Sequence, residues 1–186
     1  PMSQATVAVI DYGMGNLRRV AQARKTAAPE ADVRITHEPE VVRAAERIIL
    51  PGHGAMPDCM ANLRASGLLD ALSEGAKNKP LLGVCVGEQM LFGHAEEGNS
   101  HGLGWFAGEV VRFRVDDARD ENGAPLKVPH MGWNTVKQTR PHALWANIPD
   151  NTHYYFVHSY YVNPFDADLT VGESVYGAPF TCAVAR

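Results

Sequence analysis

The stretch "PLLGVCVGEQM", Pro80 to Met90, sets a cysteine between two glycines at the point where an apolar run ends. A short apolar run stopped by glycine is typical of a buried strand, and the residues that follow have helical spacing. The stretch therefore predicts a strand that turns directly into a helix. A strained turn of this kind needs small residues two positions before and after its centre. Gly83 and Gly87 meet that need on either side of Cys85.

Working outward, the first half of the chain alternates short β-branched apolar runs with helical patterns. Helices are predicted over 15–28, over 58–76 and after Cys85 through Phe92, and strands at "ATVAVIDYG", "ADVRIT", "RIILPGHG" and "KPLLGV". This alternation predicts a mostly parallel, flavodoxin-like α/β sheet with helices on both faces. The turns after Asp11, Leu50 and Val84 would then open at one edge of the sheet, where ligands bind in such folds.

Beyond Gly98 the pattern changes to β-like runs separated by turn-rich segments such as "DENGAP". The runs are "EVVRFRV", "HYYFVHSYYV" and "FTCAVA". They predict an antiparallel or mixed extension of the fold. We expect residues 1–186 to form a single domain, since this length suits one core.

Composition excludes several classes of protein. Of the 186 residues, 45% are hydrophobic and 20% are charged. The net charge is −4 and the chain has no run of basic residues, so we expect no nucleic-acid partner. Neither an apolar stretch of about 20 residues nor a signal peptide is evident, which predicts a cytoplasmic protein that contacts no membrane. Three dispersed cysteines without a Cys-x-x-Cys pair predict reduced thiols and no metal site.

Cys85 is a candidate nucleophile for acyl transfer. The following helix would point its free N–H groups at the sulfur and favour the thiolate, and the Val86 N–H would help to bind an oxyanion. The alternative is that Gly83 merely permits close packing and that Cys85 fills core space.

Two glycine loops lie at the same predicted edge. "PGHG" follows the third strand, and the N–H of His53 or Gly54 is a candidate second oxyanion donor, although a simple strand-ending turn would have the same sequence. "DYGMGN" invites a dinucleotide interpretation, but Arg18 stands where the third glycine would be, so we expect neither a nicotinamide nor a flavin cofactor.

Four motifs together resemble a known family over essentially the whole chain. The elbow Gly-x-Cys-x-Gly-x-Gln spans 83–89, and "DYGMGNLR", "KVPHMGWN" (127–134) and "YYFVHSYY" (154–161) accompany it. The sequence thus resembles the class I, triad-type glutamine amidotransferases, most closely the branch that serves histidine biosynthesis.

The resemblance implies a glutaminase that passes ammonia to a cyclase subunit, a (β/α)8 barrel, in a heterodimer without a cofactor or a metal. The resemblance implies that Cys85 is the nucleophile that forms a glutamyl thioester. It implies an oxyanion hole at Val86, His53 and Gly54, and contacts with the substrate glutamine from Gln89, Glu97, Ser159 and Tyr160. It places Asn16, Trp133 and Tyr155 at the partner interface.

The chain departs from the family at its end. It stops at Arg186 within "FTCAVAR", whereas the family continues through a Phe-His-Pro-Glu type segment that carries the triad histidine and glutamate. We expect a chain truncated at the C-terminus. Two alternatives stay open: an inactive interaction subunit that lacks the triad pair, and a different Cys-dependent acyl hydrolase.

Overall fold

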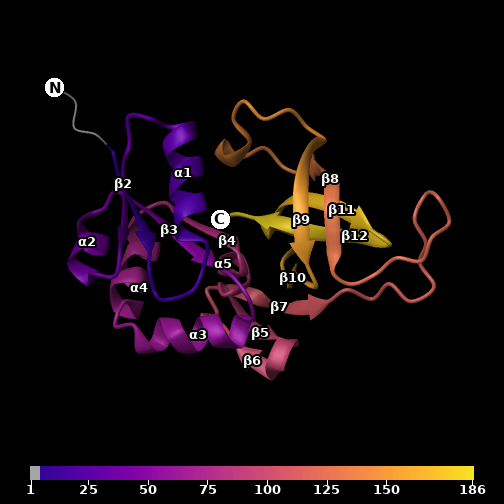
Figure 1. The fold of residues 1–186 in the computed structure, drawn as a ribbon, viewed down its shortest axis with the longest axis horizontal. Helices are drawn as coiled ribbons and strands as arrows, with labels where there is room; N and C mark the ends of the chain where they lie inside the picture. The colour runs from indigo at the N-terminus through magenta and orange to yellow at the C-terminus, as the bar shows by residue number, and fades with distance from the viewer. Residues whose placement is uncertain (1–4) are drawn as a thin grey trace. The chain divides into compact units, whose positions relative to one another are not determined.

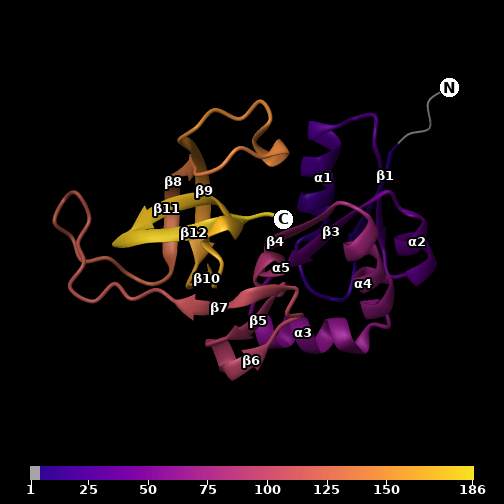
Figure 2. The same cartoon turned by 180° about the vertical axis from the view of Figure 1, so that it is seen from behind.

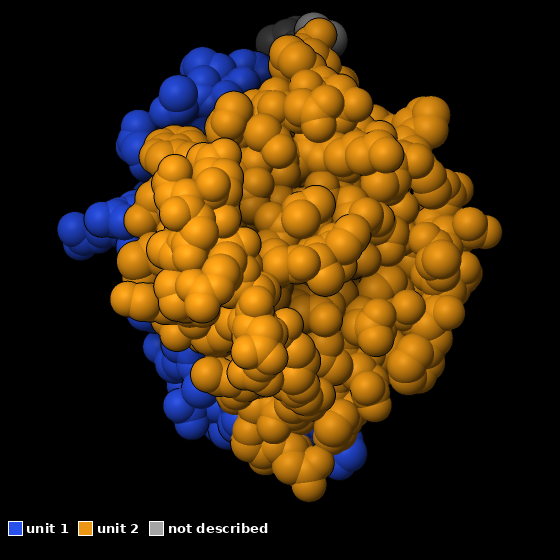
Figure 3. All heavy atoms as spheres, turned by 90° about the vertical axis from the view of Figure 1, so that its right-hand side faces the viewer, with its two compact units in different colours: residues 1–91, 100–103 blue, residues 92–99, 104–186 orange. Residues whose placement is uncertain are grey.

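The computed structural model describes residues 5–186, which form two compact units (Figure 1). Unit 1 comprises the described residues up to Leu91 together with Ser100–Leu103, and unit 2 comprises Phe92–Asn99 and Gly104–Arg186. Figure 2 shows the same ribbon from behind, and Figure 3 colours the two units in a space-filling view. The single-domain expectation stays a prediction.

Unit 1 is built on a parallel sheet of four strands in the order β2-β1-β3-β4. The strands are β1 (Thr6–Ile10), β2 (Asp32–Thr36), β3 (Arg47–Gly52) and β4 (Leu81–Cys85), and the short β6 (Ser100–His101) also belongs to this unit. β3 and β4 pair with Gly52 opposite Cys85. The predicted parallel sheet is confirmed, and because β1, β3 and β4 run the same way, the turns that follow them leave the sheet at one edge.

Helices cover both faces of this sheet. They are α1 (Leu17–Ala27), α2 (Pro39–Ala44), α3 (Met56–Ala65), α4 (Leu69–Asn78) and α5 (Val86–Gln89). Leu17 and Val20 of α1 pack against the cluster that contains Ile49. On α4, Gly75 lies directly against Ile48, and neighbouring residues of a strand point to opposite faces. The expected α/β class with helices on both faces is therefore confirmed.

Two of the predicted helices are wrong in their extent. The segment 58–76 is not one helix, because Gly67 adopts a φ of 78° and separates α3 from α4. The Leu68 N–H donates to the Ser66 hydroxyl at this break. The helix after Cys85 ends at Gln89, and Phe92, which is fully buried, begins strand β5 rather than continuing the helix. Burial in a sheet outweighs the local helical pattern at this position.

Unit 2 consists mainly of strands. One group of neighbouring strands consists of β5 (Phe92–Ala95), β7 (Phe106–Arg112) and β10 (Tyr160–Pro164). The other is an antiparallel sheet whose strands lie in the order β12 (Ala178–Val184), β11 (Thr170–Tyr176), β8 (His130–Gln138) and β9 (Thr152–His158). β5 pairs with β7 in parallel, and β7 with β10 antiparallel. Short 3-10 turns are η1 (Glu97–Asn99), η2 (Ala143–Trp145) and η3 (Ala167–Leu169). The predicted antiparallel extension is confirmed.

No helix within residues 5–186 has both the length and the apolar character that crossing a bilayer requires.

Candidate active site

The turn from β4 into α5 places Cys85 in a strained backbone conformation. Its φ is 58° and its ψ is −124°, in a region that residues with a side chain rarely adopt. The side chain is exposed. The predicted strained strand-to-helix turn is confirmed, and the alternative in which Cys85 fills core space is wrong.

Three glycines make this turn possible, because the backbones of β3, β4 and α5 touch there. A Cβ on Gly83 would lie 2.8 Å from the Gly87 carbonyl oxygen, and one on Gly87 would lie 2.0 Å from that of Leu50. A Cβ on Gly52 would lie 2.5 Å from the Gly87 nitrogen. The glycines on both sides of Cys85 are therefore required by backbone contact.

The surroundings of the thiol raise its pKa. Partial desolvation is the largest cause of the raised pKa of Cys85, and the charge of Glu88 adds to it. This direction is opposite to the one expected from a helix N-terminus at the sulfur. The physical reason is that partial burial and the nearby charge of Glu88 both disfavour the thiolate.

Glu88, in the first turn of α5, has a carboxyl group with a raised pKa. Burial raises its pKa to about 8, so the carboxyl is mostly neutral at pH 7 and ionises as the pH rises through about 8. Ionisation places a negative charge near the Cys85 sulfur, which disfavours the thiolate.

The loop after β3 lies at the same sheet edge as this turn. His53 and Gly54 follow Gly52, which pairs with Cys85 across β3 and β4. Gly54 has a φ of 84°, a value that favours glycine. The expected gathering of the two loops at one edge is confirmed. The role of their N–H groups as oxyanion donors stays a prediction.

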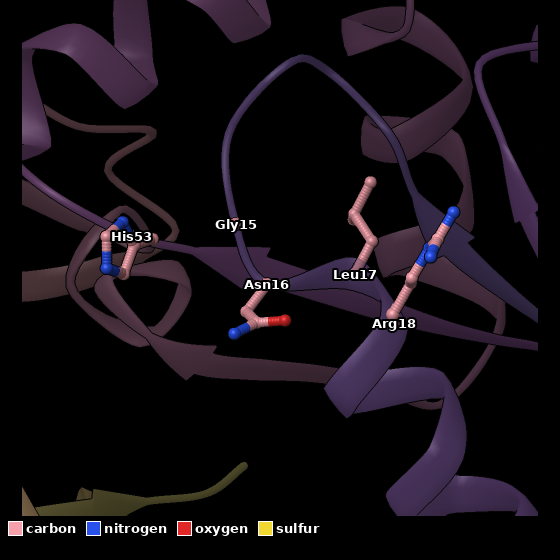
Figure 4. Close-up of a pocket in the computed structure, with 5 residues that line it drawn as sticks. All are labelled: Gly15, Asn16, Leu17, Arg18 and His53. Carbon is pink, nitrogen blue, oxygen red and sulfur yellow. The ribbon is translucent and has the colours of Figure 1, made fainter.

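A cavity of about 420 Å³ opens beside this loop (Figure 4). It is lined by Gly15, Asn16, Leu17, Arg18 and His53. Asn16 accepts a hydrogen bond from the Arg19 N–H at 3.4 Å and so caps α1. Among the described residues, no group of three or more His, Cys, Asp or Glu side chains is arranged to hold a metal ion.

The other predicted substrate residues are divided between the units. Gln89 is the last residue of α5 in unit 1. In unit 2, Glu97 begins η1 and Tyr160 begins β10. The preceding Glu96 carboxylate accepts from the Arg112 N–H at 2.9 Å, and Arg112 pairs with Tyr160 across β7 and β10. Glu97 and Tyr160 therefore belong to one region of unit 2.

The hydrogen bond between His130 and His158, beside the segment of Ser159 and Tyr160, was not predicted from the sequence. His158 Nδ1 donates to the Tyr160 carbonyl at 2.9 Å, so its Nε2 accepts from His130 Nδ1, also at 2.9 Å. Burial and, to a lesser extent, the nearby His158 lower the pKa of His130 to about 4, so this ring is neutral at pH 7. Burial lowers the pKa of His158 as well, which favours its neutral form. The only sequence signal was that each histidine lies within a family motif.

Two predicted interface residues, Trp133 and Tyr155, stand opposite each other on β8 and β9. Their rings form an edge-to-face pair with centroids 5.5 Å apart. Met131 and Val157 flank them as a second cross-strand pair. We call these four residues the apolar strip; between 55% and 71% of each is exposed.

Comparison with known families finds one family model that matches most of the described chain. The model of the family "Glutamine amidotransferase class-I" matches residues 8–182, which include the turn at Cys85, the loop at His53 and the apolar strip.

Similar proteins are found among curated sequences and solved structures. The chain is 56% identical over 180 residues to "Imidazole glycerol phosphate synthase subunit HisH" of Nitrosospira multiformis, covering 97% of this chain and 84% of that protein. It is 57% identical to the protein of the same name from Dechloromonas aromatica, with the same coverage. Its fold is similar to a glutamine amidotransferase of Thermotoga maritima, with a TM-score of 0.56 at 15% identity, covering 97% of this chain and 75% of that one. A second glutamine amidotransferase structure matches with a TM-score of 0.63 at 16% identity over 94% of this chain and 87% of that one.

The backbone contact at the turn predicts that Gly87→Ala is strongly destabilising. Its Cβ would overlap the Leu50 carbonyl oxygen, and relief requires a shift of β3. We expect a loss of about 1–3 kcal/mol or more in the free energy of unfolding, measured by urea denaturation. Gly93→Ala is the control, since its Cβ would meet nothing closer than 3.9 Å. Equal stability of the two variants would contradict the backbone contact.

The acidity of Glu88 predicts a pH effect on the thiol. Above about pH 8 the ionised carboxylate holds back ionisation of Cys85, so Glu88→Gln should lower the pKa of the thiol. The alkylation rate of Cys85 by iodoacetamide, followed by peptide mass spectrometry, should then rise at lower pH than in the wild type. Glu30→Gln removes the same charge at an exposed position and should leave the profile unchanged. An unchanged profile for Glu88→Gln would show that the two groups do not interact.

Proposed function

The chain belongs to the class-I glutamine amidotransferase family, and on that premise we propose that Cys85 hydrolyses glutamine for a cyclase subunit of imidazole glycerol phosphate synthase. The protein is a glutamine amidotransferase subunit of that enzyme, in histidine biosynthesis. The observation that carries the role of Cys85 is its exposed thiol on a backbone strained to φ 58°. Strain of this kind persists where a side chain must be held out from a turn for reaction.

In the proposed reaction the Cys85 sulfur attacks the carboxamide carbon of glutamine. The carbonyl oxygen becomes an oxyanion, which accepts hydrogen bonds from the main-chain N–H groups of Val86 and of His53 or Gly54. Collapse of this intermediate breaks the C–N bond, and the leaving amino group takes up the proton lost by the thiol and departs as ammonia. Water then cleaves the glutamyl thioester and regenerates the thiol. In triad enzymes a histidine moves these protons.

The substrate would be held by polar groups. Gln89 lies on α5, four residues after the nucleophile. Glu97 is proposed to bind the substrate's ammonium group, since a carboxylate complements that charge. Ser159 and Tyr160 are proposed to hold its carboxylate end, and the histidine pair fixes the Tyr160 carbonyl beside them.

The apolar strip supports a partner interface on unit 2. Trp133 is 71% exposed and Tyr155 is 55% exposed, although aromatic side chains gain most when buried. Contiguous exposed apolar groups of this kind mark protein-binding surfaces, and aromatics and methionine are enriched at their centres. We propose that the cyclase subunit covers the strip and that Asn16, at the cavity of unit 1, also contacts it, in a heterodimer.

A partner that accepts ammonia directly has a chemical advantage. Free ammonia is mostly protonated at neutral pH and is then not nucleophilic. A closed passage between glutaminase and cyclase delivers the unprotonated form before water can protonate it. We propose that this pair of subunits works in the cytoplasm, where the other steps of an amino-acid pathway supply the cyclase substrate.

Replacement of the nucleophile separates the two half-reactions. In the complex with its cyclase, Cys85→Ala should abolish glutamine-dependent synthesis and leave ammonia-dependent synthesis at the wild-type rate, because the cyclase keeps its own site. Both rates are measured from imidazole glycerol phosphate formed.

The control for this experiment is Cys182→Ala, which removes a partly buried thiol of β12. It should retain both activities. Equal loss of both activities in Cys85→Ala would contradict the nucleophile assignment. A wild-type complex that releases no glutamate would favour an interaction subunit without catalysis.

Truncation of the central aromatic of the strip should weaken the complex. Trp133→Ala is expected to raise the Kd for the cyclase about 30-fold, the loss typical of a buried tryptophan at the centre of an interface. Isothermal titration calorimetry measures this change. Phe165→Ala is the matched control, because Phe165 is 70% exposed and lies outside the strip. Equal effects of the two substitutions would exclude the strip as the docking surface.

A further inference from the structure

Two buried side chains hold the loop after β3 by its carbonyl groups. The Tyr12 hydroxyl donates to the Pro51 carbonyl at 2.6 Å. The Cys59 thiol donates to the His53 carbonyl at 3.3 Å. Tyr12 is only 5% exposed and Cys59 is fully buried, so neither bond competes with bulk water.

The two donors come from different elements on either side of the loop. Tyr12 lies two residues beyond the end of β1, the neighbour of β3 in the sheet. Cys59 lies in the first half of α3, the helix that begins directly after the loop. The loop is therefore held from the sheet and from the helix at once.

These bonds determine where the loop's N–H groups point. In a trans peptide, the carbonyl of one residue and the N–H of the next point in opposite directions within one plane. The bond from Cys59 to the His53 carbonyl therefore sets the direction of the Gly54 N–H. The bond from Tyr12 to the Pro51 carbonyl likewise sets the orientation of the Pro51–Gly52 peptide, which lies on the other side of the Gly52–His53 peptide.

The peptide between these two planes carries the His53 N–H. Gly52 has little room beside it, because its backbone lies against the start of α5: a Cβ built there would come within 2.5 Å of the Gly87 nitrogen. With a held plane on each side, the two ends of the Gly52–His53 peptide are fixed in position, although this peptide can still turn between them. Cys59 thus orients the Gly54 N–H, and Tyr12 and Cys59 together fix the position of the peptide that carries the His53 N–H.

The donor character of Tyr12 is stable across the working pH range. Burial raises the pKa of its phenol well above the usual range, and the neighbouring Cys59 adds to the effect. The phenol therefore stays protonated, and can donate, well above neutral pH. Its oxygen also lies 3.4 Å from the Met90 sulfur.

We propose that Tyr12 and Cys59 are positioning residues that aim the N–H groups of His53 and Gly54 at the developing oxyanion of the Cys85 reaction. This inference rests on the proposed glutaminase function. Neither side chain touches the substrate; each acts through a backbone carbonyl. Oxyanion donors act mainly in the transition state, so their misalignment lowers kcat more than it raises KM.

The test compares Tyr12→Phe, Cys59→Ala and Cys59→Ser in the complex with the cyclase. Tyr12→Phe and Cys59→Ala remove one donor each and should lower kcat for glutamine hydrolysis by roughly 10- to 100-fold with KM nearly unchanged. Cys59→Ser keeps a donor and should recover most of the loss. Ammonia-dependent synthesis by the cyclase should not change.

Tyr176→Phe is the matched control, because its hydroxyl also donates to a backbone carbonyl, that of Lys127, in unit 2. It should leave kcat at the wild-type value. A second readout does not depend on activity: the amide NMR shifts of His53 and Gly54 should move in Tyr12→Phe and Cys59→Ala, return toward wild type in Cys59→Ser and stay unchanged in Tyr176→Phe.

The outcomes separate this inference from the function on which it rests. Wild-type kcat and unmoved amide shifts in Tyr12→Phe and Cys59→Ala would overturn the positioning role, even where Cys85→Ala abolishes glutamine hydrolysis. A raised KM with unchanged kcat, or a loss equal in Cys59→Ser and Cys59→Ala, would also overturn it, since that pattern reflects packing alone. If the wild-type complex releases no glutamate, the proposed function fails, while the amide shifts still decide whether the two side chains orient the loop.

Discussion

The contact between three backbone segments at Gly52, Gly83 and Gly87 is the constraint on which the rest of unit 1 depends. With no Cβ at these positions, β3, β4 and the start of α5 approach within van der Waals distance. The chain has too little room for an ordinary turn, so the strain falls on Cys85, at φ 58°. An exposed thiol and an adjacent loop of N–H groups are the direct consequence. The same contact leaves Gly52 little room beside it, at the start of the loop that Tyr12 and Cys59 hold by its carbonyl groups.

The electrostatics of the turn follow from partial desolvation. Burial raises the pKa of the Cys85 thiol, and the charge of Glu88 adds to the effect. Glu88 is itself kept mostly neutral at pH 7 by burial, which limits the repulsion it exerts on the sulfur. In the proposed reaction, activation of Cys85 would therefore need a base, as in triad enzymes.

The two faces of the antiparallel sheet in unit 2 carry different groups of side chains, because side chains alternate along each strand. On β9, Phe156 and His158 face inward and join an aromatic cluster with His130, while Tyr155 and Val157 face outward. Successive residues of a strand point to opposite faces, so β9 carries both His158 of the histidine pair and half of the apolar strip. The inner face orders the segment at Tyr160 through His158, and the outer face carries the exposed apolar strip, the proposed partner surface.

The sequence by itself determined the parallel sheet, the antiparallel extension and the turn at Cys85, because these depend on local periodicity and on glycines within a few residues of one another. It also indicated the family, since the motifs lie in short contiguous stretches. Tertiary structure alone decided the break at Gly67, the strand at Phe92 and the direction in which the pKa of Cys85 moves, because burial depends on what packs from elsewhere. The bond from Tyr12 to Pro51 joins residues 39 positions apart, and the one between His130 and His158 spans 28. No local pattern encodes such pairs; they form only when the sheet brings distant segments together and water is excluded from between them.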